Sequence, residues 1–366
     1  SEAAYQTRQA FWIALALGVP YWFICYYSEP LLLAFRIDPS IVPDAAGYLR
    51  AISWGAPGLC LVLLLRYFSE GTGNTKPTMF YGVAGVLLNI PLNYVLMFGK
   101  LGFPALGTVG CGYATSIVIW LQFLFLLVYI ATHRHYRPFS LLSRLEMPHM
   151  KTIISLLKLG LPIAVAIAVE GSLFVGAALL IGQLGPVPAA AHLIAINFAA
   201  LMFMIPVGLS SAISIRVGNA LGRGEPEAAR YAGRIGLLIV FLFQTVSATA
   251  MFLFPELIVR IYTDDVAVGT LAVSLLFYAA VFQYPDGVQM VMAGALRGYK
   301  DTRMPMVYTI VAFWIVGMTL GYTLTFNRGM GPAGMWIGMI GGLTVASVLM
   351  LRRFHHTSNK EIVGAT

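Results

Sequence analysis

The stretch LLKLGLPIAVAIAVEGSLFVGAALLIG, residues 156–182, is long and apolar enough to cross a lipid bilayer as a single helix. Near its middle it carries one carboxylate, Glu170. An ionised acid at that depth costs about 2.5–3.5 kcal/mol on insertion scales, and such acids usually face protein or a water-filled cavity used by ions or substrates. The stretch therefore predicts an integral membrane protein in which Glu170 belongs to a transport site.

The composition of the whole chain favours the same class. Hydrophobic residues make up 59% of the sequence and charged residues 10%, with a mean hydropathy of +0.81, whereas a soluble domain has about 25% charged residues. The net charge of +8 comes from Lys and Arg between apolar runs, so we expect no nucleic-acid partner. The three cysteines show neither a disulfide framework nor metal-ligand spacing.

Ten apolar runs have the length of membrane spans. They cover residues 10–33, 48–70, 78–98, 108–131, 156–182, 189–212, 235–258, 268–294, 306–326 and 333–351. When the runs alternate across the bilayer from a cytoplasmic Ser1, eighteen of the 23 Lys and Arg residues fall in segments on the inner side. By the positive-inside rule, we expect both termini of this chain to be cytoplasmic.

The chain also repeats itself at an offset of 227 residues. The segment NTKPTM at 74–79 resembles DTRMPM at 301–306, and Gly71 recurs as Gly298 at the same offset. The first four spans thus resemble the last four, which leaves the fifth and sixth without partners. A two-fold repeat then predicts two more helices ahead of Ser1, and an ancestral ten-span protein is the alternative.

These patterns predict an all-α integral membrane protein of two pseudo-symmetric helix bundles, with ten spans of an expected twelve. An N-terminal bundle lacking its first two helices would occupy residues 1–131. A cytoplasmic linker at 132–155 would lead to a six-helix C-terminal bundle at 156–354 and a cytoplasmic tail at 355–366.

Only two of the 15 acids, Glu170 and Asp286, lie in span interiors, because the others fall between spans or at span ends, and no Lys or Arg in a span interior is placed to neutralise these two. Exchangeable cations, Na⁺ or H⁺, are therefore the expected partners, and a pair of protonated structural acids is the alternative. Pro57-Gly58 and Pro285-Asp286-Gly287 occupy corresponding places in the two halves. Paired interruptions of this kind predict a binding site.

Other residues inside the spans could complete such a site. Candidates for a polar cavity lining are Asn89, Asn93, Asn197 and Gln283. Asn89 and Asn93 share a helix face and could equally bridge two helices. Phe174, Phe282 and Tyr284 could contact a flat cationic drug by cation–π attraction, or they could be ordinary core aromatics.

Enzyme chemistry has no support in the sequence. We find no Ser/His/Asp grouping and no metal-ligand cluster. The segment GTGNTK at 71–76 lacks the Gly-Lys-Ser/Thr ending of a phosphate-binding loop. We therefore expect no enzyme and no cofactor, only a coupling ion, Na⁺ or H⁺, moving down its gradient.

Five segments together resemble the multidrug and toxic compound extrusion (MATE) family, most of all its NorM branch. They are LNIPLNY (88–94), EGSLF (170–174), AAHLIAINF (190–198), SIRVGNALG (214–222) and ALRGYKDT (295–302). The resemblance implies a bacterial inner-membrane protein of twelve helices, in two six-helix bundles around a V-shaped cavity. It also implies exchange of Na⁺ or H⁺ for small cationic, amphipathic drugs or dyes.

Carried over residue by residue, the resemblance makes Glu170 and Asp286 the cation-coupling acids and the tentative Na⁺ ligands. Asn89 and Asn93 match polar residues of the family's first bundle. A family Asp in the first helix, which would complete a second acidic site, has no counterpart here. We expect a monomer in contact with membrane lipid. A lipid-linked oligosaccharide flippase of related architecture is the alternative, and the acidic charges inside the spans favour cationic cargo over its anionic pyrophosphate.

Overall fold

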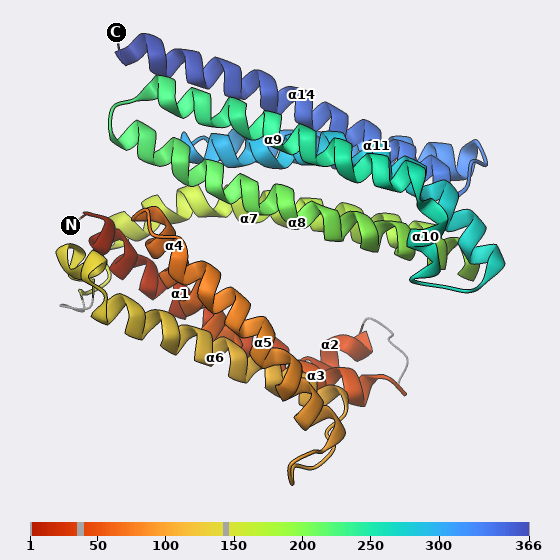
Figure 1. The fold of residues 1–366 in the computed structure, drawn as a ribbon, viewed down its shortest axis with the longest axis horizontal. Helices are drawn as coiled ribbons and strands as arrows, with labels where there is room; N and C mark the ends of the chain where they lie inside the picture. The colour runs from red at the N-terminus through yellow and green to blue at the C-terminus, as the bar shows by residue number, and fades with distance from the viewer. Residues whose placement is uncertain (1, 35–39, 142–145, 366) are drawn as a thin grey trace. The chain divides into compact units, whose positions relative to one another are not determined.

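A computed structural model describes residues 2–34, 40–141 and 146–365, and all regular secondary structure within these ranges is helical. The chain divides into two compact units, Ser1–Leu156 and Leu157–Thr366, each a bundle of long helices (Figure 1). In the described ranges nine helices are long and apolar enough to cross a membrane. The pair α3 and α4, bent by 45°, brings the number to ten if it counts as one span. The predicted all-helical membrane fold is confirmed.

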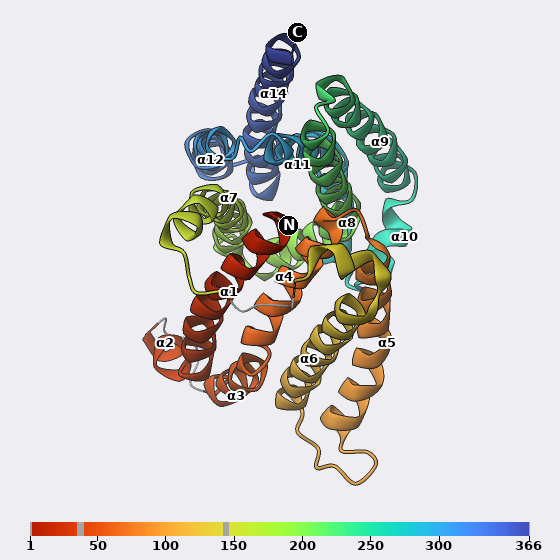
Figure 2. The same cartoon turned by 90° about the vertical axis from the view of Figure 1, so that its left-hand side faces the viewer.

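In its described residues the first unit contains three long apolar helices, the bent pair α3 and α4, and short connecting helices (Figure 2). The elements are α1 (Glu2–Tyr26), α2 (Glu29–Ala34), α3 (Val42–Ser53), α4 (Ala56–Gly71), α5 (Lys76–Phe98), α6 (Thr108–Thr132) and the 3₁₀ helix η1 (Arg134–Phe139). Helix α6 packs on α3, α4 and α5, and α1 packs on α3 and α4. The apolar runs form helices here because only intrahelical hydrogen bonds can satisfy the backbone in lipid.

The second unit is organised around α11. Its elements are α7 (Met150–Gly182), α8 (Pro186–Gly222), α9 (Pro226–Leu253), α10 (Pro255–Arg260), α11 (Val266–Gly298), α12 (Arg303–Ile310), the π-helical segment η2 (Val311–Met318), α13 (Thr319–Tyr322), a second π-helical segment η3 (Thr323–Asn327) and α14 (Pro332–Ala365). Helices α8, α9 and α14 pack along α11. Fully buried side chains such as Leu275, Leu276 and Met292 place α11 in the core of this unit.

The helix ends follow the repeat seen in the sequence. Helix α4 ends at Gly71 and α5 begins at Lys76, whereas α11 ends at Gly298 and α12 begins at Arg303. Both pairs of ends differ by the offset of 227 residues that relates NTKPTM to DTRMPM. The repeated segments are therefore equivalent turns between successive spans.

Of the two helix interruptions predicted at prolines, the structure shows one near Pro57 and none at Pro285. The chain bends by 45° between α3 and α4, just before Pro57. Pro285, in contrast, lies inside the continuous helix α11. A proline removes one backbone hydrogen bond and crowds the preceding turn. Helices α8, α9 and α14 pack against α11 and keep it helical despite the missing hydrogen bond. Asp286 therefore lies on a continuous helix and not at a helix break.

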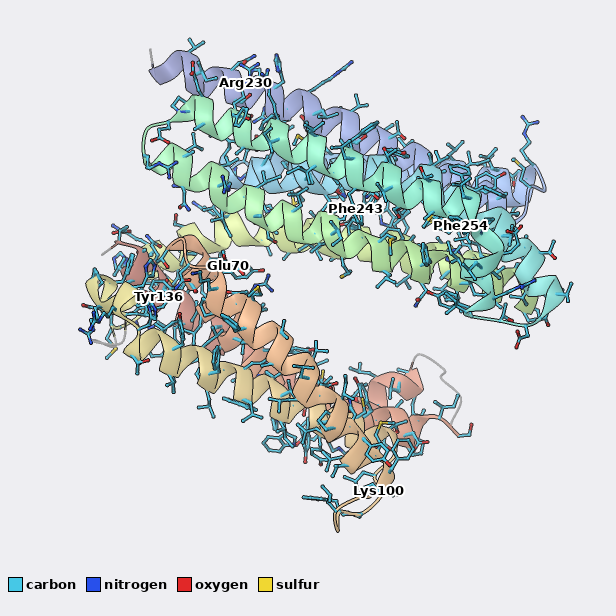
Figure 3. All side chains as sticks on the ribbon, in the orientation of Figure 1. Glu70, Lys100, Tyr136, Arg230, Phe243 and Phe254 are labelled. Carbon is cyan, nitrogen blue, oxygen red and sulfur yellow. The ribbon has the colours of Figure 1, made fainter. Side chains whose placement is uncertain are left out.

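The segment after α6, predicted to be a linker, packs against the first unit. Tyr136 of η1 is 2% exposed, and its hydroxyl lies 2.6 Å from Ser69 Oγ. Figure 3 shows Tyr136 and Glu70 at the same end of this unit. Glu70 Oε1 forms an ion pair with Arg66 Nε at 2.8 Å. At the other end of the chain, α14 continues to Ala365 through the segment predicted to be a tail. The domain limits, with Ser1 and Thr366 outside the described residues, stay a prediction.

A buried glutamine attaches the start of α7 to α1. Gln9 is fully buried, its amide Nε2 donates to Met147 O at 3.0 Å, and its Oε1 accepts from His149 N at 2.7 Å. We expect Gln9→Leu to lower the stability of the first unit by about 1–3 kcal/mol, because it leaves two backbone groups without their partner. Limited proteolysis of the full chain in detergent should then cut within residues 133–149 faster than in the parent.

The control for that experiment is Gln6→Leu on the same helix. Gln6 makes an exposed hydrogen bond to Glu2, four residues away, and pairs of this kind contribute only about 0.2–0.5 kcal/mol. Equal cleavage rates for the two variants would contradict the role assigned to Gln9.

Candidate cation-coupling site

Glu170 lies on α7, half-buried, in the second unit. The Gln289 amide of α11 donates a hydrogen bond to Glu170 Oε1 at 3.1 Å. Gln289 is itself only 2% exposed. The carboxylate is therefore held by a neutral donor from a neighbouring helix, which orients it without neutralising its charge.

Asp286, the second predicted acid, lies one helical turn before Gln289 on α11 and is 3% exposed. The carboxyls of Asp286 and Glu170 are close enough to interact electrostatically. Five ion pairs occur among the residues that the structure describes, and neither acid takes part in one. Because buried charges need a paired ion or a proton, this pair of acids can accept a cation.

A basic residue just outside the predicted span 268–294 lies near Glu170. Arg297, in the last turn of α11, acts electrostatically on Glu170 and lines the same cavity. Its Nη2 donates to Ser210 Oγ at 2.7 Å, and that hydroxyl donates to Met290 O at 2.7 Å. The guanidinium is thus fixed by α8 and partly compensates Glu170 from a distance.

A cavity of about 50 Å³ joins these groups. Its lining comes from α7, α11, α12 and α14 and includes Glu170, Gln289, Arg297, Thr302 and Thr309. A space of this size can hold a water molecule or a small ion, provided that polar partners surround it. The cavity therefore suits a desolvated cation better than a drug.

Sequence reasoning missed Arg297, although a spacing signal was available. Asp286, Met290, Ala293 and Arg297 follow one another at intervals of four, three and four residues, which places them along one stripe of α11. A hydropathy profile of α11 does not reveal this stripe, because only the first and last of its four residues are charged. Ser210, on α8, has no comparable signal in the sequence.

The four residues predicted to line a polar cavity do not lie together in the structure. In the first unit, Asn93 Nδ2 donates to Asn89 Oδ1 at 2.7 Å, so these two residues pair with each other. In the second unit, the exposed Asn197 accepts from the Tyr262 hydroxyl at 3.3 Å. Gln283 is 2% exposed, and its amide lies 3.0 Å from Met251 Sδ. Gln283 therefore faces α9, and not the cavity around Glu170.

The three aromatic candidates also separate. Phe282 is buried between Phe174 and Trp336, with ring centroids 6.0 and 5.4 Å away. Its position fits the core of the second unit better than a drug contact. The Tyr284 hydroxyl donates to Thr245 Oγ1 at 3.2 Å, in an exposed environment. Contact of any of these rings with a drug stays a prediction.

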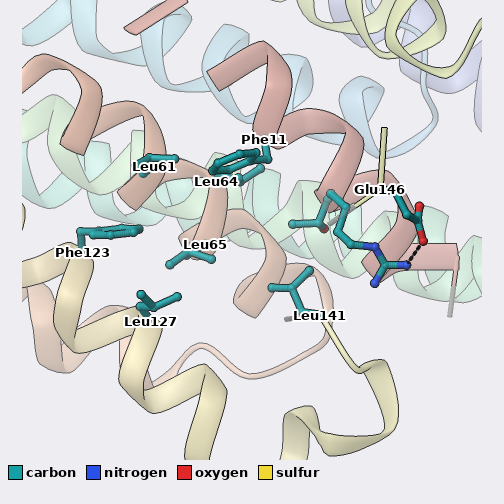
Figure 4. A pocket seen from close by; sticks show the side chains of 10 residues that line it. Phe11, Leu61, Leu64, Leu65, Phe123, Leu127, Leu141 and Glu146 are labelled. Atoms are coloured by element: carbon teal, nitrogen blue, oxygen red, sulfur yellow. Dashed lines mark hydrogen bonds and ion pairs between the residues drawn. The ribbon is translucent and has the colours of Figure 1, made fainter. Parts of the chain in front are cut away.

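The first unit has a larger cavity, of about 190 Å³, between α1, α4 and α6 (Figure 4). Leucine and phenylalanine side chains form most of its wall, and Arg8 and Glu146 form a 2.7 Å ion pair at one end. None of the sequence-predicted site residues lines this cavity. Within the described ranges, no group of three His, Cys, Asp or Glu side chains could hold a metal ion. The carboxylates of Glu170 and Asp286 carry oxygen donors, which suit hard cations.

Apolar helical spans with two acids buried among them are typical of a membrane transporter. The sequence profile of the MatE family matches residues 1–95 and 162–323. The probable multidrug resistance protein NorM of Xanthomonas axonopodis pv. citri is 47% identical over 96% of this chain and 77% of its own length. Multidrug resistance protein PmpM of Pseudomonas aeruginosa is 41% identical over 97% and 76%. The chain belongs to the MatE family of transporters.

Solved structures agree in fold. A eukaryotic MATE transporter, AtDTX14, superposes with a TM-score of 0.85 at 20% identity and covers all of this chain and 82% of its own. A MATE structure in a straight conformation gives a TM-score of 0.86 at 21% identity, with 98% and 81% covered. The comparisons do not bear out the expected loss of two helices before Ser1, which stays a prediction.

Proposed function

We propose that this chain is a secondary multidrug efflux antiporter, which exchanges Na⁺ or H⁺ for cationic amphipathic drugs across the bacterial inner membrane. It would work as a monomer with both termini in the cytoplasm. The printed names of its relatives, multidrug resistance proteins of three bacterial genera, support drug export. The basic residues on one side of the spans support the orientation.

The observation that carries this proposal is the position of Glu170 and Asp286. Both acids lie in one unit, on neighbouring helices, without ion-pair partners among the described residues. A cation or proton that binds there must compete with a cationic drug for the same negative charge. Exchange follows if the two ligands favour different conformations, because each then lowers the affinity for the other.

Dye efflux from proteoliposomes that contain the full chain tests this function. Each gradient is imposed alone, with either Na⁺ or H⁺ more concentrated outside the vesicles than inside. A fluorescent cationic dye should leave the vesicles under the gradient of the coupling ion, and it should stay inside when neither gradient is present. Efflux under one gradient identifies the coupling ion. Dye movement that ignores both gradients would rule out the antiporter, and ion conduction far above carrier turnover would indicate a channel.

A further inference from the structure

A groove of about 650 Å³ follows the junction of α8 and α9 in the second unit. We call it the α8–α9 groove, and its lining comes from positions 209–223 of α8 and 228–239 of α9. The two helices pack against each other and are joined by the short turn 223–225, so they run antiparallel. Figure 1 shows this turn at the end of the unit that also carries the C-terminus. The groove shares no described lining residue with the cavity around Glu170.

The groove changes from polar to apolar along its length. Arg223 and Asn219 lie at the end near the turn, whereas Leu209 and Ile239 lie at the far end. Arg216 lies between them, roughly 10 Å along α8 from Arg223 at the helical rise per residue. This gradient suits an elongated amphipathic molecule, with its polar part near the turn and its apolar part at the far end.

The floor of the groove is a direct contact between the two helices. A Cβ placed on Gly236 would overlap the side chain of Ile213, which is 4% exposed. Because Gly236 has no side chain, Ile213 packs on the backbone of α9 at this point. Ala212 and Ile239, which flank the contact, are both exposed. The groove is therefore closed below by tight packing and accessible from the surface.

The wall of the groove carries positive charge. Arg216 is exposed and takes part in none of the five ion pairs found among the described residues. Arg223 pairs with Glu225 of the turn at 2.8 Å, but both side chains are at least half exposed, and surface pairs of this kind are weak. Among the described residues that line the groove, none is Asp or Glu. An anionic group is therefore the complementary ligand.

The setting of the groove in a membrane protein favours one kind of anion. Both α8 and α9 are long and apolar enough to cross a membrane, and arginines near the end of a span extend to the level of the lipid headgroups. Basic pockets between membrane helices bind anionic headgroups, and a guanidinium matches the oxygens of a phosphate. A soluble phosphate would leave Leu209 and Ile239 uncovered, whereas a phospholipid covers both parts of the groove.

We propose that the α8–α9 groove binds one anionic phospholipid, whose phosphate pairs with Arg216 beside Asn219 and whose acyl chain lies along Ala212 and Ile239. The inference goes beyond the proposed antiport, because it concerns neither the coupling ion nor the drug. It rests on the membrane location that the MatE family gives the chain. The bound lipid covers the exposed junction of α8 and α9 and neutralises Arg216 there.

Native mass spectrometry of the purified, delipidated full chain in detergent tests the proposal by counting bound lipids. Three probes are titrated separately: phosphatidylglycerol, phosphatidylcholine with the same acyl chains, and glycerol 3-phosphate. We expect saturable binding of phosphatidylglycerol that is tighter than binding of phosphatidylcholine, because phosphatidylcholine has no net charge to complement Arg216. Glycerol 3-phosphate should bind more weakly than phosphatidylglycerol, because it has the phosphate but no acyl chain.

Three variants separate the headgroup from the acyl chain. Arg216→Gln should weaken phosphatidylglycerol binding by about fivefold and remove the preference over phosphatidylcholine, which is the effect of one basic residue at a membrane surface. Arg216→Lys keeps the charge and should retain most of the binding. Ala212→Trp fills the apolar part of the groove and should weaken binding of both lipids. Since Arg216 and Ala212 are exposed, the variants should unfold at the temperature of the parent when no lipid is present.

Two substitutions outside the groove are the matched controls. Arg234→Gln removes an exposed arginine near the start of α9 that is not among the lining residues. Ala200→Trp adds the same ring at an exposed position of α8 before the groove begins. Both control variants should bind phosphatidylglycerol like the parent.

The outcomes separate the lipid site from the proposed function. Equal binding of the two lipids by the parent overturns the site, and so does an Arg234→Gln variant that loses as much binding as Arg216→Gln. Glycerol 3-phosphate that binds as tightly as phosphatidylglycerol indicates a soluble anion and overturns the site as well. None of these results bears on dye efflux. If the lipid binds as expected but no gradient drives dye efflux by the parent, the lipid site stands and the proposed function fails.

Discussion

Replacing Asp286 by asparagine should remove gradient-driven drug efflux while leaving the protein folded. Asparagine has nearly the same shape and keeps the oxygen, but it carries no charge to hold a cation. Allosteric coupling between ligands is typically worth about 1–3 kcal/mol, or 5–150-fold in affinity. We expect the stimulation of efflux by the ion gradient to fall by about that factor. Glu170→Gln should behave similarly, because Glu170 is the other acid of the pair.

The measurement is dye efflux from proteoliposomes at several gradient strengths, alongside dye binding without a gradient. Asp264→Asn is the matched control, since Asp264 is exposed between α10 and α11 in the same unit. It should transport like the parent. If Asp286→Asn and Glu170→Gln both keep efflux and its dependence on the gradient, neither acid couples the ion to the drug.

Gly338→Ala should disrupt the packing of α14 more than any conservative surface change. A Cβ on Gly338 would overlap backbone atoms of Gly321 and lie 2.7 Å from Gly317 O. On either side, Gly334 approaches Thr325 N, and Gly342 lies against Ala312 and Gly317 in the same way. Small residues four apart on both helices thus allow backbone contact, as in membrane helix pairs generally.

Since the atoms facing Gly338 are backbone atoms, they cannot rotate aside, and the two helices must separate. Overpacking of this kind costs about 1–3 kcal/mol. Gly341, three residues further along α14, is the control, because a Cβ there would meet only the end of Leu320, at 3.0 Å. Gly341→Ala should be neutral or stabilising by about 0.5–1 kcal/mol, through the lower entropy of the unfolded chain. Thermal unfolding followed by size-exclusion chromatography should separate the two variants, and equal unfolding temperatures would contradict the close contact.

The sequence alone determined the class of fold and the position of the repeat, and it predicted ten spans where the described residues form nine or ten. These features are local, because a run of about twenty apolar residues must become a helix in lipid whatever surrounds it. Glu170 and Asp286 stood out for the same reason, as the two acids in the interiors of the predicted spans. Family resemblance added a role for them that hydropathy could not supply.

Only the tertiary structure decided which groups those acids meet. Gln289 reaches Glu170 from another helix, Arg297 is fixed through Ser210, and Gln283 faces α9 although its position in the sequence suggested a cavity wall. Hydropathy reports how deep a side chain lies, but not the direction in which it points. That direction depends on which helices approach closely. Glycines such as Gly287 and Gly338 permit a close approach because they have no side chain.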